Sequence, residues 1–196
     1  MKKILKRTLI ALGIVAAVAV AGVIALVFVV ENDAGVAYTT GDYAKAFEKY
    51  SAAAAKGDAV AQNALGILYE QGQGVAKNLE KACEWYHKAA QQGHAGAQYN
   101  FGMMLRDGTG IARDHQLAFG WFLRAAEQGS AQAQNELGNM YLQGEGVSHD
   151  SATALSWFRK SADGGSSWGQ YNVGAMYWDG DGVPVDEAKA LEWYRK

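Results

Sequence analysis

Cysteine and proline are almost absent from this chain of 196 residues, which contains one cysteine (Cys83) and one proline (Pro184). A single cysteine cannot form a disulfide within the chain, so no disulfide framework holds the fold together. The residues at the equivalent positions of the repeat described below are Phe119, Leu155 and Leu191. We therefore expect Cys83 to be a small buried apolar side chain and not a reactive thiol.

Clusters of basic residues are also missing. After residue 30 the chain carries 14 Lys and Arg against 20 Asp and Glu, and no run of Lys and Arg occurs there. A nucleic-acid partner favours a contiguous basic face, so we expect the chain to bind no nucleic acid.

The residue patterns that carry chemistry are absent as well. The four histidines form no His-x-x-x-His pair, and there is no second cysteine to complete a zinc site. No Gly-x-Ser-x-Gly elbow for a nucleophilic serine occurs. The sequence therefore predicts that the protein is not an enzyme, with no catalytic residues, no metal, no cofactor and no small-molecule substrate.

One long apolar run is present near the start of the chain. Residues 8–30 are 23 residues without a charge, and as a helix they would span about 34 Å, enough to cross the hydrocarbon core of a bilayer. Basic residues lie within 1–7, and Glu31 and Asp33 follow the run. Because basic flanks stay in the cytoplasm, we expect an uncleaved signal-anchor helix of a single-pass bacterial inner-membrane protein, with the remaining chain in the periplasm.

A cleaved signal peptide is the alternative interpretation. Ala19 and Ala21 are small residues at the spacing of a cleavage site before Gly22. The apolar run continues to residue 30, however, which is longer than a signal peptide requires. Both interpretations export the remainder of the chain, whereas the opposite membrane orientation would keep it in the cytoplasm.

A repeat with a period of 36 residues dominates the remaining sequence. Each unit has an apolar residue followed by glycine, then Tyr or Leu, two glycines separated by one residue, an alanine, and a tryptophan followed by Tyr or Phe. In the first unit these positions are Leu65, Gly66, Tyr69, Gly72, Gly74, Ala82 and Trp85, and each recurs three times at intervals of 36. Self-similarity at a period of about 20–50 residues is typical of a solenoid, whose units bury their apolar faces only against neighbours.

The first half of each unit predicts a helix, over 59–70 in the first unit. Its apolar positions share one face at helical spacing: Ala61, Leu65, Leu68 and Tyr69. Gly72 is placed to end the helix in a left-handed conformation. Gly66 lies mid-helix, where glycine costs about 1 kcal/mol relative to Ala, so we expect a second helix to approach closely there.

The second half of each unit predicts another helix, over 79–91 in the first unit. Asn78 precedes it, and Asp114, Asp150 and Asp186 stand at the same position in later units. Asn and Asp are N-cap residues, whose side chains accept hydrogen bonds from the free N–H groups of a helix. The unit is therefore expected to be an antiparallel helix pair.

The chain thus divides into an array of such pairs behind the apolar segment. The expected divisions are a basic cytoplasmic N-terminus at 1–7, the transmembrane helix at 8–30, a linker and N-terminal half-repeat at 31–57, whole repeats at 58–93, 94–129 and 130–165, and a shortened fourth repeat at 166–196. Stacked helix pairs turn into a superhelix with a concave inner surface.

The repeat resembles the Sel1-like repeat family, relatives of tetratricopeptide repeats. The motif that carries the resemblance is Ala-Gln-x-x-Leu-Gly-x-x-Tyr-x-x-Gly-x-Gly-Val, an acidic cap, and Ala-x-x-Trp-Tyr/Phe-x-x-Ala-Ala-x-x-Gly, and it covers residues 41–196. The resemblance implies an all-α fold, a right-handed α/α solenoid. It also implies an adaptor or scaffold of the bacterial envelope or an immunity protein. A cysteine-rich branch linked to β-lactam binding or hydrolysis ties each unit with a disulfide, which Cys83 alone cannot do.

Positions that the repeat leaves variable are the candidates for binding a partner. On the first helix of each unit the positions equivalent to 60, 63, 67 and 70 share one face and vary, and first helices line the inner curve. The candidate partner-binding residues on this concave face are Glu70, Tyr99, Met103, Arg106, Asn135, Asn139, Trp168, Tyr171 and Trp178. Large aromatic residues and arginine are favoured as interface anchors.

Two tryptophans depart most from their equivalents, Trp168 and Trp178. Because they lie in the last unit, partner contact and covering of the open end of the array are both possible roles. We expect a membrane-anchored scaffold that binds a protein or peptide on its concave face. The alternatives are an immunity or inhibitor protein that neutralises an exported enzyme and, from a different class, an envelope hydrolase acting on cell-wall or β-lactam substrates.

Overall fold

The computed structural model describes residues 33–196, which form an all-α solenoid without a β-strand in that range. Residues 33–39 are helical and precede nine further helices. These are α2 (Tyr43–Ala54), α3 (Ala59–Gln71), α4 (Leu79–Gln91), α5 (Ala95–Asp107), α6 (His115–Glu127), α7 (Ala131–Gln143), α8 (Ser151–Asp163), α9 (Ser167–Asp179) and α10 (Glu187–Tyr194).

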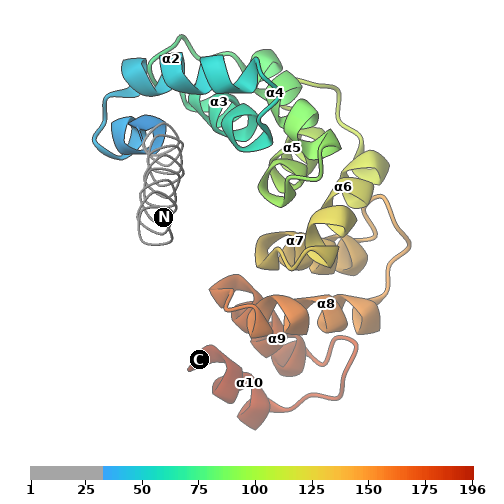
Figure 1. Cartoon of the computed structure of the whole chain (residues 1–196). Helices are drawn as coiled ribbons and strands as arrows, with labels where there is room; N and C mark the ends of the chain where they lie inside the picture. The colour runs from blue at the N-terminus through green and yellow to red at the C-terminus, as the bar shows by residue number, and fades with distance from the viewer. Residues whose placement is uncertain (1–32) are drawn as a thin grey trace, which may run out of the picture.

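The helices follow one another along an arc (Figure 1). The first helix of each unit, α3, α5, α7 or α9, lies toward the inner side of the arc, and the second helix lies toward the outer side. The period of 36 residues thus corresponds to one helix pair, as the sequence predicts.

Capping residues set the helix boundaries. The side chains of Asn78, Asp114, Asp150 and Asp186 each accept from a backbone N–H in the first turn of the second helix, which confirms them as N-caps. At the other turn, Gly72 and its equivalents adopt a left-handed conformation, with φ +72° at Gly72, and end the first helix.

The mid-helix glycines mark the closest approach within each pair. A Cβ added to Gly102 would lie 2.8 Å from the ring of Phe122, which packs directly on the bare backbone of α5. Tyr86, Phe158 and Tyr194 occupy the same place over Gly66, Gly138 and Gly174. The close contact that the sequence predicts at Gly66 is confirmed, and it explains why each unit accepts a residue that weakens a helix.

The core runs from unit to unit without a centre. One cluster of buried side chains extends from Ala82 on α4 to Met140 on α7, and a second one links α8 and α9. Cys83 is 5% exposed within the first cluster, which confirms it as a buried apolar residue. Burial raises the pKa of its thiol to about 11.

The expected transmembrane helix at 8–30 and the N-terminus at 1–7 lie outside the described residues. Within residues 33–196, none of the helices has the length and apolar character needed to cross a bilayer.

Candidate binding surface

The inner side of the arc contains a cleft between three successive first helices. The cleft has a volume of about 450 Å³, and its lining comes from α5, α7 and α9. We call it the inner cleft and define it by Tyr99, Gln132, Asn135, Glu136, Asn139, Ser166, Trp168 and Asn172. Four of the predicted partner-binding residues therefore meet in one place: Tyr99, Asn135, Asn139 and Trp168.

Amide side chains form the floor of the inner cleft. Asn172 Nδ2 donates to Asn135 Oδ1 at 2.8 Å, which joins α9 to α7. The same pairing occurs two units earlier, where Asn100 Nδ2 donates to Asn63 Oδ1 at 3.1 Å. These amides are held in place from one unit to the next, and each still has unused donors and acceptors.

Glu136 of the inner cleft is held by an ion pair with Arg106. Arg106 Nη1 donates to Glu136 Oε2 at 2.5 Å and Arg106 Nε donates to Asp107 Oδ1 at 2.7 Å. The hydrogen bond to Asp107 and the two neighbouring carboxylates raise the pKa of Arg106 above its ordinary value, so its charge is permanent. Asn139 Nδ2 also donates to Glu136, which leaves this carboxylate with two donors.

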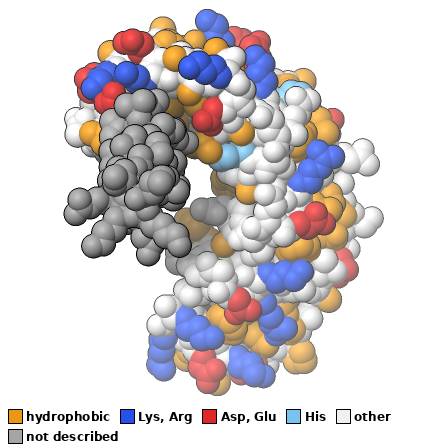
Figure 2. All heavy atoms as spheres, viewed as in Figure 1, with side chains coloured by type: hydrophobic (Ala, Val, Ile, Leu, Met, Phe, Trp, Pro, Cys, Tyr) orange, Lys and Arg blue, Asp and Glu red, His pale blue; other side chains and the backbone are white. Residues whose placement is uncertain are grey.

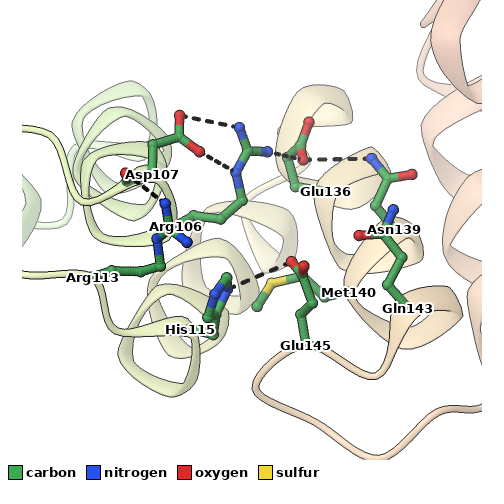
Figure 3. Close-up of a pocket in the computed structure, with 9 residues that line it drawn as sticks. All are labelled: Arg106, Asp107, Arg113, His115, Glu136, Asn139, Met140, Gln143 and Glu145. Carbon is green, nitrogen blue, oxygen red and sulfur yellow. Dashed lines mark hydrogen bonds and ion pairs between the residues drawn. The ribbon is translucent and has the colours of Figure 1, made fainter.

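A second pocket lies on the other side of this ion pair (Figure 3). It has a volume of about 310 Å³. Glu136 and Asn139 line both pockets. The other residues of the second pocket are Arg106, Asp107, Arg113, His115, Met140, Gln143 and Glu145. His115 Nδ1 lies 3.5 Å from Glu145 Oε2. Arg106 and His115 each face a carboxylate, whereas Arg113 donates to the backbone carbonyl of Asp107 at 3.4 Å.

Three predicted residues are engaged by the fold itself. Glu70 accepts a hydrogen bond of 2.5 Å from the hydroxyl of Tyr86, and Met103 packs against the core. Asn135 is buried and accepts from Asn172. Their role in binding a partner stays a prediction. In the structure each of the three side chains already contacts another residue of the solenoid.

Trp168 differs from the other exposed aromatic residues of the last unit. Its indole is 71% exposed, and its equivalents Val60, Gly96 and Gln132 are exposed as well. The position is therefore open to solvent in every unit, whether or not another unit follows.

Tyr171 and Trp178 are exposed for another reason. Trp178 is 49% exposed, whereas its equivalents Glu70, Arg106 and Leu142 are half-buried. Tyr171 is also exposed and packs on the ring of Tyr194, with the ring centroids 5.6 Å apart. Both positions are covered in the preceding units by the unit that follows. Their exposure therefore reflects their place in the last described unit.

Four residues of the inner cleft are absent from the candidates predicted from the sequence: Gln132, Glu136, Ser166 and Asn172. Glu136 and Asn172 occupy the position after 63 in the unit, which reads Ala64, Asn100, Glu136 and Asn172. This position varies between units as much as the positions equivalent to 60, 63, 67 and 70 do. Its variation could therefore have identified it as a candidate. The helical wheel alone places it beside the chosen face and not on it.

The outer helices carry a regular array of aromatic and basic side chains. Lys88, Arg124, Lys160 and Lys196 lie over the rings of Trp85, Trp121, Trp157 and Trp193, the first at 4.1 Å from the ring centroid. Such cation–π contacts stabilise exposed sites by about 0.5–1 kcal/mol each. Figure 2 shows acidic and basic side chains interspersed over the visible face.

Among the described residues, no group of three or more His, Cys, Asp or Glu side chains is arranged to hold a metal ion.

Comparison with known proteins identifies the repeat. The model of the Sel1 repeat family matches residues 32–58, 59–94, 95–130, 131–166 and 169–196. No curated protein matches the chain significantly.

Solved structures agree with the family match. A protective antigen of uropathogenic Escherichia coli with an SLR fold is 36% identical over 82% of this chain, with a TM-score of 0.76. This chain covers only 36% of that antigen's length. A Sel1 repeat protein from Oxalobacter formigenes is 36% identical over 83% of this chain and 67% of its own, with a TM-score of 0.75. An immunity protein from Pseudomonas aeruginosa is 25% identical over 82% of this chain and 63% of its own, with a TM-score of 0.57.

Proposed function

Since the chain belongs to the Sel1 repeat family, we propose that it is a membrane-anchored scaffold that binds a protein or peptide partner on its concave face. Sel1 repeats generally mediate protein–protein interactions. The observation that carries the proposal is the inner cleft, where Trp168 stands at a position that is exposed in every unit. Exposed tryptophans beside fixed polar groups are typical anchors of interfaces.

Whole-cell photocrosslinking tests the concave face directly. A photoreactive residue replaces Gln132, which is exposed on α7 and lines the inner cleft. The matched control replaces Ser156, which is exposed on the second helix α8. We expect one discrete adduct from position 132 and none from 156. Equal adducts from both positions, or none from 132, would contradict the proposal.

We further propose that residues 8–30 anchor the protein in a bacterial inner membrane and that the repeats lie in the periplasm. The support is the uncharged run of 23 residues between a basic start and an acidic flank. Alkaline extraction should leave the chain in the membrane fraction, and alkaline phosphatase fused after Lys196 should be active. A mature chain that begins at Gly22 and is released by alkali would favour cleavage and export.

An immunity or inhibitor protein is the second candidate. The similarity to the immunity protein of Pseudomonas aeruginosa favours it, since 82% of this chain aligns at 25% identity. In that case the partner captured at position 132 would be an exported enzyme, and stoichiometric addition of this protein would abolish its activity. A captured partner without enzymatic activity would favour the scaffold.

An envelope hydrolase is the third candidate, from a different class. It would be favoured by turnover of a cell-wall or β-lactam substrate that disappears on a single Ser, Glu or His substitution. We propose that no such turnover occurs.

A further inference from the structure

The lining of the inner cleft consists of amides and aromatic rings. Four of its eight residues are amides, Gln132, Asn135, Asn139 and Asn172, and two are aromatic, Tyr99 and Trp168. Each planar amide presents a donor and an acceptor side by side. Among the residues that the structure describes, no aliphatic side chain lines the inner cleft.

Charge in the inner cleft is compensated. Glu136 is the one ionisable carboxylate of the lining, and Arg106 binds it at 2.5 Å. Tyr99 is half-buried beside this carboxylate, and burial followed by the charge of Glu136 raises the pKa of its hydroxyl. The hydroxyl therefore stays neutral and can donate. A ligand held mainly by its own charge has no uncompensated partner here.

The described part of the inner cleft has no pocket for an aliphatic side chain of a ligand. Such side chains gain their affinity by being buried in desolvated apolar pockets. The inner cleft offers polar atoms at its floor and aromatic surface at its walls. The ligand it fits is polar around its rim and apolar on a flat face.

A pyranose ring has this distribution. Its hydroxyl groups radiate from the edge and exchange hydrogen bonds with amides, while its C–H groups form a face that packs on an indole or phenol ring. The Asn172–Asn135 hydrogen bond fixes two amides before any ligand arrives, which lowers the ordering cost of binding.

We propose that the inner cleft binds a neutral oligosaccharide, with one pyranose packed on Trp168 and hydrogen-bonded to Asn135, Asn139 and Asn172. This inference concerns the same concave face as the proposed function and assigns a second ligand class to it. It goes beyond that function by assigning a ligand class that is not a protein.

Titration of the full chain with sugars tests the proposal. The chain is purified in a zwitterionic detergent without a sugar headgroup, because glycosidic detergents would compete. The probes are neutral oligosaccharides built from glucose, galactose, mannose and N-acetylglucosamine, with oligogalacturonate as the acidic control. Binding is followed by saturation-transfer NMR and calorimetry.

We expect at least one neutral oligosaccharide to bind and oligogalacturonate to bind more weakly. Trp168→Ala should weaken that binding about tenfold or more, which corresponds to about 1.4 kcal/mol. Trp178→Ala is the matched control, because Trp178 is exposed but outside the inner cleft, and it should change the affinity less than about twofold.

Absence of binding by every neutral probe would overturn the proposal, as would unchanged binding in Trp168→Ala. The circular dichroism spectrum of each variant verifies the fold. If crosslinking at position 132 captures a protein while no sugar binds, the proposed function stands and this inference fails. If neither experiment gives a ligand, both fail.

Discussion

The interior units and the fourth unit bury the same positions to different extents. The aromatic residue over the mid-helix glycine is almost fully buried in three units, with Phe122 at 0% exposure, whereas Tyr194 in the fourth is 42% exposed. The fourth unit has a first helix of the same length as the others and an N-cap on both helices, but its second helix α10 has 8 residues against 13 in α8. A unit of this solenoid therefore owes much of its core to the unit that follows it.

The junctions between units differ as well. In the first two, a glutamine network joins the helices: Gln62 Nε2 donates to Ala54 O at 3.2 Å and Gln62 Oε1 accepts from Gln92 at 2.7 Å. Gln98 and Gln128 repeat this arrangement. At the third junction Gly164 replaces the last glutamine, and within the described residues nothing donates to the buried Gln134 Oε1.

Two further exchanges lie close to Gly164 in the sequence. Ser161 replaces the alanine of the other units and donates to Ala131 O at 2.7 Å, and Gly169 replaces another alanine. A Cβ on Gly169 would lie 2.7 Å from the Ser161 hydroxyl, so the serine occupies the volume that the glycine gives up. An alanine at 169 would also meet the backbone nitrogen of Ala162 at 2.6 Å.

Some positions on the first helices are covered by the unit that follows, and others are exposed to solvent in every unit. Trp178 is exposed because it belongs to the last described unit, but Trp168 occupies an exposed position in all four units. Only the second kind of position is available for recognition along the whole arc.

The largest difference in stability between the units is expected when alanine replaces the aromatic residue that packs over the mid-helix glycine. Phe122→Ala should lower the free energy of unfolding by about 3–5 kcal/mol, because it empties a fully buried site. Tyr194→Ala should cost about 1 kcal/mol or less, since its ring is partly in solvent. Urea unfolding followed by circular dichroism measures both values. Similar losses would contradict the dependence of each unit on the next.

Replacing the mid-helix glycines by alanine should also change stability differently in the two kinds of unit, but by less. Gly102→Ala forces a methyl group against the buried Phe122 ring, and we expect a net loss of about 1–3 kcal/mol. In Gly174→Ala the partly exposed Tyr194 ring can move away, and alanine favours the helix by about 1 kcal/mol. The second variant should therefore be neutral or stabilised in the same assay.

The missing glutamine can be restored. Gly164 has φ −75°, close to the −85° of Gln128, so glutamine fits the backbone there. Gly164→Gln should complete the hydrogen bond to Gln134 Oε1 and raise the free energy of unfolding by about 1 kcal/mol. The added Cβ would lie 3.1 Å from that of Ala131, which requires a slight shift of the helix end. A destabilised variant would show that this junction is built differently from the others.

The smallest expected effect on stability comes from comparing the reactivity of two thiols, Cys83 and a cysteine placed at position 191. Cys83 is buried and its pKa is raised to about 11, so almost no thiolate is present at pH 8. Its equivalent Leu191 is exposed in the fourth unit. In Leu191→Cys the new thiol should react with a disulfide reagent within seconds to minutes while Cys83 reacts only in denaturant. Rapid loss of both thiols would refute the difference in burial.

The fold follows from the sequence because each unit restates the same local rules. Asn78 caps a helix, Gly72 ends one and Gly66 admits an aromatic ring, and the period repeats all three. The burial of Cys83 follows from the apolar residues at its equivalent positions.

The candidate site was predictable only in part. The variable face led to Tyr99, Asn139 and Trp168, but the period cannot tell which variable residues pair with each other across units. Asn135 with Asn172 and Arg106 with Glu136 are contacts between units, and they depend on the rotation of each helix pair relative to the next. That rotation is a property of packing and is not encoded at any single position.

The most direct test is the crosslink from position 132 measured in two tryptophan variants of the full chain. The adduct should fall about tenfold in Trp168→Ala and persist in Trp178→Ala, because only Trp168 lines the inner cleft. An adduct that persists in Trp168→Ala, or one that is lost in Trp178→Ala alone, would contradict recognition through the exposed inner positions.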